Sequence, residues 1–331
     1  MNKKVITCFS LVVIWFSTSI SPANSLENGE IIKSDPNAVS VGFDNHGGCG
    51  GFMISPRILL TAAHCTYGVK LPNFETYKLE DTEVYVFSAD KLYREAVKSV
   101  KIYRPKNFNW QQSNGYWGYN EDFAAVVLSK PLPFNNKVKI ATLDEIKNFR
   151  ETKTKITLIG FGFQSSNRSI AAQFPSKATF ELIDQTEADL TINEYRRKWT
   201  TTSGKYDYPL HFKVPKGDIT PCDGDSGSPV FVEKDGTRFY IGPVSYMLGS
   251  TNCGADKFWG DNGAIQSFYP AIQYTDLITE AEKYVADNPY IEPKTKNTGF
   301  NNKITITCIK GKSTKKVSGI NPKCPAGFKK P

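Results

Sequence analysis

Short runs of apolar or alternating residues, separated by turn residues, cover the chain from Val39 onward. The runs are rich in β-branched and aromatic side chains, and glycine, proline and asparagine fall between them, as is typical of strands joined by tight turns. The predicted strands are residues 39–43, 50–54, 58–61, 82–87, 96–103, 122–128, 156–159, 178–184, 229–233, 239–246 and 264–268. Residues 271–285 instead carry apolar side chains at nearly helical spacing and predict one amphipathic helix. This pattern predicts an all-β protein, a sandwich or barrel, with a single helix near its end.

The first 25 residues differ from the rest of the chain. Two lysines come before an apolar run, residues 5–16, and small polar residues follow up to Ser25. This is the pattern of a signal peptide, which we expect to be cleaved after Ser25. A membrane anchor is the alternative, but about 12 interrupted apolar residues are too few to span a bilayer. We therefore expect an exported protein without a membrane span, secreted or at the cell surface (extracellular or periplasmic).

Cysteine usage agrees with export. Cys8 lies in the leader, and the six others suggest three disulfides in an oxidising compartment. They fall into three sequence-local pairs, which favours Cys49–Cys65, Cys222–Cys253 and Cys308–Cys324 among the fifteen pairings that six cysteines allow. A metal site is the alternative, and the lack of a Cys-x-x-Cys motif argues against it. No metal and no other cofactor is expected.

Positive charge is concentrated at the C-terminus. Residues 292–331 hold ten lysines and one acidic residue, Glu292, a formal charge of +9 against +8 for the whole chain. We divide the chain into a leader (1–25), a main domain (26–288) and a basic linker with a small disulfide-closed module (289–331). The module resembles a short Cys- and Lys-rich segment at the ends of bacterial cell-surface proteins. Its charge favours an anionic partner such as teichoic acid, phospholipid or nucleic acid, and a solvated basic tag is the alternative.

Three polar residues interrupt the strand pattern. His64 follows the apolar run 58–61, Asp122 opens the run 122–128, and Ser226 lies in a turn between Gly224 and Gly227. Alone, each is more often a capped or solvated group, and the turn around Ser226 would fit a polar surface loop as well as a nucleophile. Together, a nucleophile, a base and an acid at strand ends indicate acyl-transfer chemistry.

The segments Thr61-Ala-Ala-His-Cys65, Asp122-Phe-Ala-Ala-Val126 and Gly224-Asp-Ser-Gly227 resemble the three signatures of the chymotrypsin/trypsin family of serine proteases, in the family's order. Further similarity lies at 49–54, 160–162 and 243–246. The resemblance covers about residues 39–286 and, with the C-terminal module, points to a secreted bacterial member. It implies two packed antiparallel six-stranded β-barrels, a C-terminal α-helix and a small basic extension.

The resemblance also implies roles. Ser226 would be the nucleophile, His64 the general base and Asp122 the acid that orients His64, and the backbone N–H groups of Gly224 and Ser226 would form the oxyanion hole. His46 and His211 are weaker base candidates, for which surface positions are expected. The expected protein is a monomeric secreted endopeptidase acting on proteins or peptides. The alternatives are a catalytically silent homologue that serves as a surface-binding or adhesion module, and a surface-binding protein whose functional part is the tail.

Specificity is read from the same resemblance. Thr220 stands six residues before Ser226, at the base of the primary pocket, where trypsin-type enzymes have aspartate, so cleavage after Lys or Arg is not indicated. Ser245, Tyr246 and Met247 replace the family's Ser-Trp-Gly pocket wall. Met247 would narrow the pocket toward small or medium uncharged residues, or would simply fill the core. The aromatic segment 107–120 would line subsites or form a packed loop, and 254–263 lengthens the loop after Cys253.

Activation leaves two alternatives. In the family, a new N-terminal amine pairs with the aspartate before the serine, here Asp225. The segment Glu30-Ile-Ile-Lys-Ser34 weakly resembles the family's Ile-Val-Gly-Gly start, which would place the new terminus at Ile31 or Ile32. A mature chain that begins at Leu26 would instead exclude this zymogen scheme.

Overall fold

The structure is a computed structural model that describes residue 26 and residues 29–43, 46–70, 75–88, 96–113, 116–162, 174–191, 210–215, 219–248, 264–292, 304–319 and 322–331. The chain divides into two compact units, Met1–Tyr290 and Ile291–Pro331. The predicted signal peptide lies outside the described residues. No helix in the described ranges is long and apolar enough to cross a membrane.

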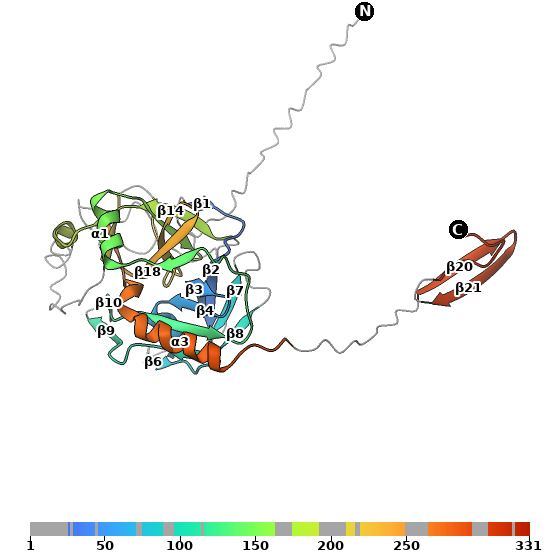
Figure 1. The fold of residues 1–331 in the computed structure, drawn as a ribbon, viewed down its shortest axis with the longest axis horizontal. Helices are drawn as coiled ribbons and strands as arrows, with labels where there is room; N and C mark the ends of the chain where they lie inside the picture. Colours follow the sequence, from blue (N-terminus) through green and yellow to red (C-terminus); the bar gives the residue numbers. More distant parts are fainter. Residues whose placement is uncertain are drawn as a thin grey trace, which may run out of the picture. The chain divides into compact units, whose positions relative to one another are not determined.

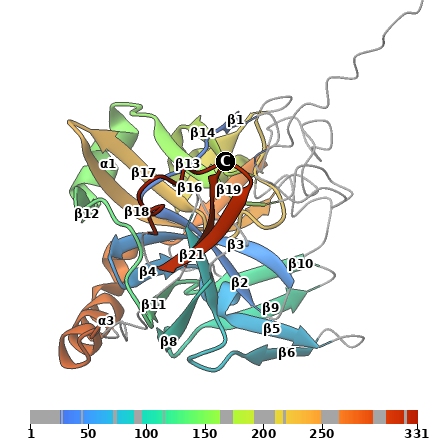
Figure 2. The same cartoon turned by 90° about the vertical axis from the view of Figure 1, so that its right-hand side faces the viewer.

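The first half of the larger unit is a closed barrel of six antiparallel strands in the order β11–β4–β3–β2–β7–β8 (Figure 2). The strands are β2 (Ala38–Phe43), β3 (His46–Ser55), β4 (Ile58–Thr61), β7 (Tyr85–Ser88), β8 (Val97–Tyr103) and β11 (Ala124–Leu128). Every residue of β4 and β11 is buried. Their continuous apolar sequence therefore fits strands that are covered on both faces.

The second half is a nine-stranded sheet in the order β1–β14–β13–β17–β18–β19–β16–β15, with β12 paired to β18. Its strands are β1 (Glu30–Ile31), β12 (Val138–Ile140), β13 (Ile156–Gly160), β14 (Ser176–Phe180), β15 (Leu182–Ile183), β16 (Leu210–Val214), β17 (Pro229–Lys234), β18 (Thr237–Leu248) and β19 (Ala264–Phe268). The all-β class is confirmed. Within the described residues, the closed barrel belongs to the first half, and the second half is an open sheet.

Aromatic stacking joins the two halves. Phe52 on β3 stacks against Tyr240 on β18, with ring centroids 4.6 Å apart, and against Phe231 on β17 at 5.7 Å. All three residues are buried. Large aromatic rings stabilise an interface through the apolar area that they bury, so this cluster fixes the seam along which residues of both halves can meet.

The predicted helix is confirmed, but its first turn is a 3-10 helix. The helix η3 (Ala271–Tyr274) leads into α3 (Thr275–Asp287), which lies along β8 and β11 (Figure 1). The ring of Tyr274 stacks on Phe123 with centroids 4.5 Å apart, which ties this segment to the residue after Asp122.

The helix α1 (Leu143–Glu151) was not predicted, because it buries only two side chains, Ile146 and Phe149. Its sequence signal is a capping box. Thr142 accepts a hydrogen bond from the backbone of Glu145, and the Glu145 side chain accepts one from the backbone of Thr142.

Two short hairpins also escaped the strand pattern. They are β5 (Tyr67–Lys70) with β6 (Glu75–Lys78), and β9 (Asn109–Ser113) with β10 (Tyr116–Asn120). The second hairpin forms the backbone of the aromatic segment 107–120, whose side chains from residue 109 onward lie outside the described residues.

The expected surface position of His211 is wrong. His211 is buried on β16, its Nδ1 lies 3.0 Å from Ser267 Oγ, and burial lowers the pKa of its imidazole to about 4. β16 lies between β15 and β19, and its residues are buried or half-buried. This environment depends on strand pairing that periodicity alone did not reveal. The side chain of His46 lies outside the described residues.

Candidate active site

His64 and Asp122 are brought together by the pairing of β4 with β11. His64 lies on η1 (Ala63–Thr66), directly after β4, and Asp122 lies just before β11. His64 Nδ1 is 2.7 Å from Asp122 Oδ2, and the His64 backbone N–H donates to Asp122 Oδ1 at 2.8 Å. A carboxylate in this place holds the imidazole in the tautomer with its proton on Nδ1, so Nε2 is left to accept a proton.

The backbone at Glu121 turns Asp122 inward. Glu121 has a φ of 53°, in the left-handed region that costs a non-glycine residue roughly 1 kcal/mol. Asp122 is fully buried, whereas Glu121 is half-buried. Because β11 begins only at Ala124, the turn at Glu121 separates these two carboxylates, and strand alternation does not.

Ser245 has a contact that sequence reasoning missed. It was predicted as part of the pocket wall, yet its Oγ donates a hydrogen bond to Asp122 Oδ2 at 2.5 Å. Ser245 lies on β18, in the second half of the unit. The two residues are 123 positions apart, and no local pattern marks the contact.

The loop around Ser226 is held by backbone hydrogen bonds on both sides. Gly50 N–H on β3 donates to the Ser226 carbonyl at 2.7 Å, and Gly227 N–H donates to the Val244 carbonyl at 2.7 Å. Gly224 and Gly227 have φ values of 91° and 75°, a backbone conformation that residues with a side chain rarely adopt. The main chain therefore fixes the direction of the Ser226 side chain.

Alternate backbone N–H groups of this loop donate hydrogen bonds. The N–H of Asp225 donates to the Cys222 carbonyl at 3.0 Å, and that of Gly227 donates to Val244. Among the hydrogen bonds of the described residues, the N–H groups of Gly224 and Ser226 are not used. These are the two donors that the sequence predicted for an oxyanion hole.

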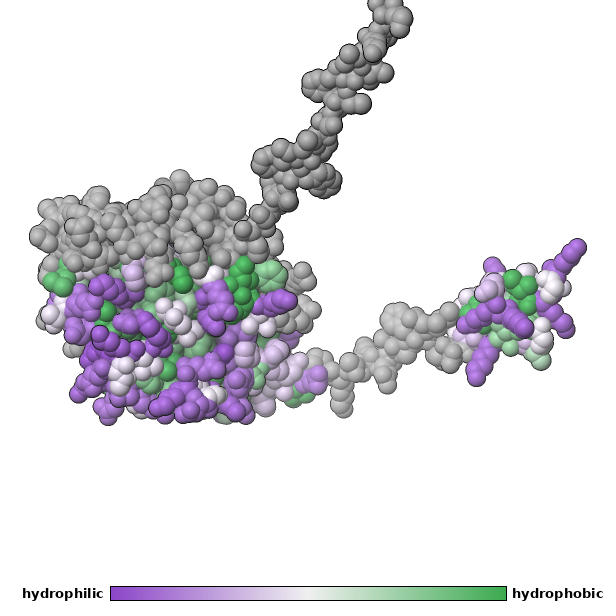
Figure 3. All heavy atoms as spheres, turned by 90° about the horizontal axis from the view of Figure 1, so that it is seen from above, coloured by the Kyte–Doolittle hydropathy of each residue, from purple (hydrophilic) through white to green (hydrophobic). Residues whose placement is uncertain are grey.

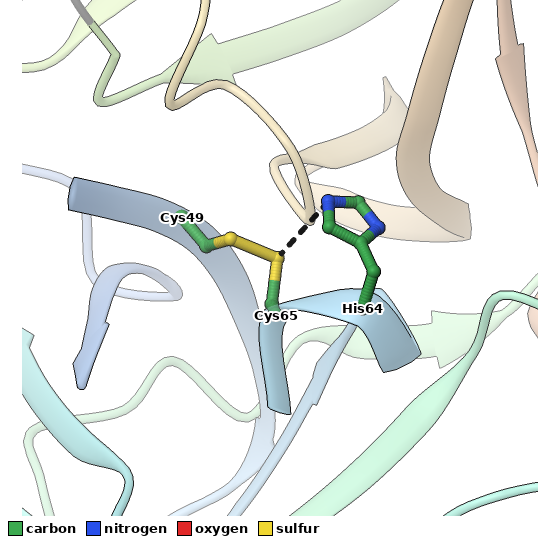
Figure 4. Close-up of side chains that lie close together, drawn as sticks. All are labelled: Cys49, His64 and Cys65. Carbon is green, nitrogen blue, oxygen red and sulfur yellow. Dashed lines mark hydrogen bonds between the residues drawn. A yellow bond between two sulfur atoms is a disulfide. The ribbon is translucent and has the colours of Figure 1, made fainter. Parts of the chain in front are cut away.

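These contacts link the three predicted catalytic residues in one closed ring. From Ser226 it runs through Gly50, the Cys49–Cys65 disulfide, His64, Asp122, Ser245, Val244 and Gly227 back to Ser226. In the described part of the chain, His64 Nε2 contacts Cys65 Sγ at 3.7 Å and makes no hydrogen bond to the Ser226 hydroxyl (Figure 4). Such hydrogen bonds are often long without substrate and shorten when it binds.

The same place holds a group of metal-ligand type atoms. Sulfur and nitrogen atoms of Cys49, His64 and Cys65 all lie within 4.8 Å of one another (Figure 4). Zinc binds cysteine as thiolate, and both sulfurs here are joined in a disulfide. The arrangement therefore braces the turn that carries His64 and does not fit a metal ion.

Asp225 is a second buried carboxylate. Its Oδ2 accepts from Cys222 N–H at 2.7 Å, and its Oδ1 accepts from Gly162 N–H at 2.8 Å. Burial raises the pKa of Asp225 to about 7, although these N–H donors act in the opposite direction. Cys222 is disulfide-bonded, and its predicted partner, Cys253, lies outside the described residues.

Part of the predicted pocket is described. Thr220 is fully buried and Tyr246 nearly so, while Met247 is half-buried and packs against the core of the second sheet. This contact supports the interpretation of Met247 as a core-filling side chain. The extended loop 254–263 lies outside the described residues.

A six-stranded barrel and a second β-sheet, with His, Asp and Ser motifs at their seam, define the chymotrypsin-like fold. The trypsin family profile matches residues 29–272, and the chain belongs to this family of serine peptidases.

Several curated relatives are about one-quarter identical to it over the aligned residues. Coagulation factor IX from Cavia porcellus is 24% identical over 244 residues, covering 72% of this chain and 70% of that protein. Vitellin-degrading protease from Bombyx mori is 24% identical over 254 residues, covering 75% and 86%. Transmembrane protease serine 9 from Rattus norvegicus is 25% identical over 204 residues, 61% of this chain, and the chain spans 17% of that protein's length.

Replacing Gly50 by alanine is expected to displace Ser226. A Cβ at Gly50 would lie 2.2 Å from Ser228 Oγ and 2.6 Å from Ser228 Cα, so the serine loop must shift. Because misplacement by about 1 Å can lower a rate 10²-fold, we expect kcat/KM for a peptide substrate to fall about 100-fold. Gly42→Ala is the matched control, since its Cβ would meet its nearest atom at 3.6 Å. Equal activity of the two variants would contradict this prediction.

Proposed function

We propose that this protein is an exported serine endopeptidase that cleaves peptide bonds through an acyl-enzyme. The observation that carries the proposal is the ring of contacts through Ser226, His64 and Asp122. The ring joins three residues from distant segments that suit three roles: Ser226 as nucleophile, His64 as base and Asp122 as the acid that orients the base. Membership of the trypsin family supports the same reaction class.

In this mechanism, Ser226 Oγ attacks the carbonyl carbon of the substrate while His64 Nε2 takes the hydroxyl proton. Asp122 holds the other imidazole nitrogen and stabilises the cation that forms. The oxyanion would accept hydrogen bonds from Gly224 and Ser226 N–H, the two donors that the loop leaves unused. His64 then returns the proton to the leaving amine, and water repeats the sequence to release the acid.

We propose that Ser245 is a positioning residue in this reaction. Its hydroxyl occupies a lone pair of Asp122 Oδ2, the same oxygen that holds His64. Several hydrogen bonds to one buried carboxylate hold it in one orientation. Ser245 therefore acts on the substrate through Asp122 and His64.

For the primary pocket, we propose a preference for small or medium uncharged residues. Thr220 is fully buried at the position where a trypsin-type pocket would hold a carboxylate. A substrate Lys or Arg side chain would lose its hydration there without gaining an opposite charge. The neutral hydroxyl of threonine favours neutral side chains.

We also propose that the active chain begins at Leu26, so that removal of the signal peptide is itself the activating step. Leu26 is fully buried. A Cβ placed on Gly160 would lie 2.9 Å from Leu26 Cδ2 and 2.3 Å from Asp225 Oδ1, so the Leu26 side chain lies close to this carboxylate. A free amine at Leu26 would supply the buried carboxylate with a cation. Ile31 instead pairs with Ser176 in the sheet, and Ile32 N–H donates to the Pro175 carbonyl, which argues against a terminus at either isoleucine.

A fluorophosphonate probe tests the reaction. We expect covalent labelling of the wild-type chain on Ser226 and none of Ser226→Ala, because the probe needs an activated hydroxyl. Asp122→Asn should label and hydrolyse peptides about 10⁴-fold more slowly, since the amide favours the wrong imidazole tautomer. An unreactive wild type with intact structure would point to the silent homologue that serves as a binding module.

Cleavage of a peptide library tests the pocket. We expect no enrichment of Lys or Arg before the scissile bond for the wild type, because Thr220 offers no charge. Thr220→Asp should raise kcat/KM for Lys and Arg substrates at least tenfold relative to Thr220→Asn, which has the same shape without the charge. A wild-type preference for Lys or Arg would overturn the proposed specificity.

A chain that begins at Leu26 is expected to be active, and a chain that begins at Asn24 is expected to be at least 100-fold less active. In the longer chain Asp225 lacks a cation, and its pKa near 7 exceeds the ordinary value of 3.8. The folded state then holds more protons than the unfolded state between about pH 4 and 7, so the free energy of unfolding falls as pH rises across this range, by roughly 4 kcal/mol.

Kinetic assays and urea unfolding at several pH values measure both effects. Asp225→Asn in the longer chain is the control, and it should remove the fall in stability between pH 4 and 7. Equal kcat/KM for the chains that begin at Leu26 and Asn24 would refute activation by signal-peptide removal.

A further inference from the structure

The smaller unit combines a fixed fold with charge of one sign. Its strands β20 (Ile304–Lys310) and β21 (Ser313–Gly319) form a hairpin, and the Cys308–Cys324 disulfide ties the following segment to it. Lys329 pairs with Ile309 on the outer edge of β20. Residues 304–331 contain seven lysines and no acidic residue.

All seven lysines are exposed: Lys310, Lys312, Lys315, Lys316, Lys323, Lys329 and Lys330. None takes part in an ion pair within the described part of the chain. Figure 3 shows hydrophilic side chains that project from several sides of the unit. Lys315 and Lys316 are successive residues of β21, so they point to opposite faces of the hairpin.

A solvated basic tag would not need this fold. Cys308 is the one fully buried side chain among the described residues of the unit, so there is no core to offset the repulsion between lysines. Units of this size usually depend on a disulfide for stability. The disulfide and the edge pairing therefore hold the lysines in fixed positions against their own repulsion, an arrangement that an anionic ligand would stabilise.

We infer that this unit binds a flexible, linear phosphate polymer that wraps around it. Lysines on both faces fit a chain that bends, whereas a flat bilayer would engage one face and would favour apolar side chains that insert beside the lysines. Nucleic-acid sites favour arginine and exposed aromatic rings for stacking. Residues 304–331 contain no arginine, and their one aromatic residue, Phe328, is half-buried.

This binding does not depend on the peptidase reaction. The polymer would concentrate the attached protease wherever phosphate polymers are exposed outside the membrane. Because lysine acts as a point charge, the affinity of the unit would depend on the spacing of phosphates along the polymer and not on the groups that link them.

Titration of the full chain, Leu26–Pro331, with long-chain inorganic polyphosphate tests the inference. Flexible strands lose about 0.7 in log–log salt slope per neutralised phosphate, so seven lysines predict a slope of about −5. The affinity should then fall roughly 10³-fold between 50 and 200 mM salt. A slope near −2 would mean that one face alone is engaged and would overturn the wrapping geometry.

Paired substitutions locate the site. Lys315→Gln with Lys316→Gln, and separately Lys329→Gln with Lys330→Gln, should each weaken binding at least tenfold and make the slope shallower by about 1.4. Lys130→Gln with Lys234→Gln removes the same charge from exposed positions of the larger unit and should leave binding unchanged. Lys315→Arg with Lys316→Arg should retain it.

The intact Cys308–Cys324 bond, checked by mass spectrometry without reductant, shows that each variant keeps the fold. An equal loss of affinity in the Lys130/Lys234 control would overturn the assignment to this unit. Tighter binding to phosphatidylglycerol vesicles, or to single-stranded or duplex DNA, than to polyphosphate at equal phosphate concentration would overturn it in favour of a membrane or a nucleic acid.

Discussion

The backbone hydrogen bond from Gly50 to the Ser226 carbonyl is the contact on which the rest of the site depends. It joins a strand of the barrel to a loop of the second sheet at 2.7 Å, and a Cβ at Gly50 would lie 2.6 Å from Ser228 Cα in that loop. The close approach also requires glycine on the other segment, because a Cβ at Gly227 would lie 2.4 Å from the Gly50 carbonyl oxygen. Two glycines in distant segments are thus required by one approach of main chain to main chain. The position of Ser226 follows from the seam between the two halves.

Asp122 closes the other side of that seam. Burying a carboxylate is unfavourable unless donors replace the lost water, and Asp122 has the His64 backbone, the His64 ring and the Ser245 hydroxyl. Ser245 follows Val244 on β18, and Val244 is bonded to Gly227 and Ser228 of the serine loop. The same strand therefore holds both the Ser226 loop and Asp122. A movement of β18 would therefore displace the Ser226 loop and Asp122 together.

Local patterns in the sequence were enough to predict individual strands and the polar residues at their ends. Continuous apolar runs marked β4 and β11, and their polar flanks marked His64 and Asp122. The contact of Ser245 with Asp122 was missed because it links residues 123 positions apart and depends on how two sheets pack. The burial of His211 and Leu26 was missed because it too depends on residues far apart in the sequence, here within the second sheet and its core. By contrast, α1 had a local signal in its Thr142–Glu145 capping box, which apolar periodicity passed over because the helix buries so little.

The two buried carboxylates show how surroundings divide one chemical group into two roles. Asp122 contacts the His64 imidazole, which in the proposed mechanism would become a cation beside it when it takes the proton of Ser226. Asp225 receives backbone N–H groups, which carry only partial charge, and burial still raises its pKa to about 7. A cation at Asp225 would therefore stabilise the folded loop, and the loop sets the N–H groups of Gly224 and Ser226 on either side of it. With the proposed start at Leu26, this carboxylate would couple the start of the mature chain to the geometry of the proposed oxyanion site.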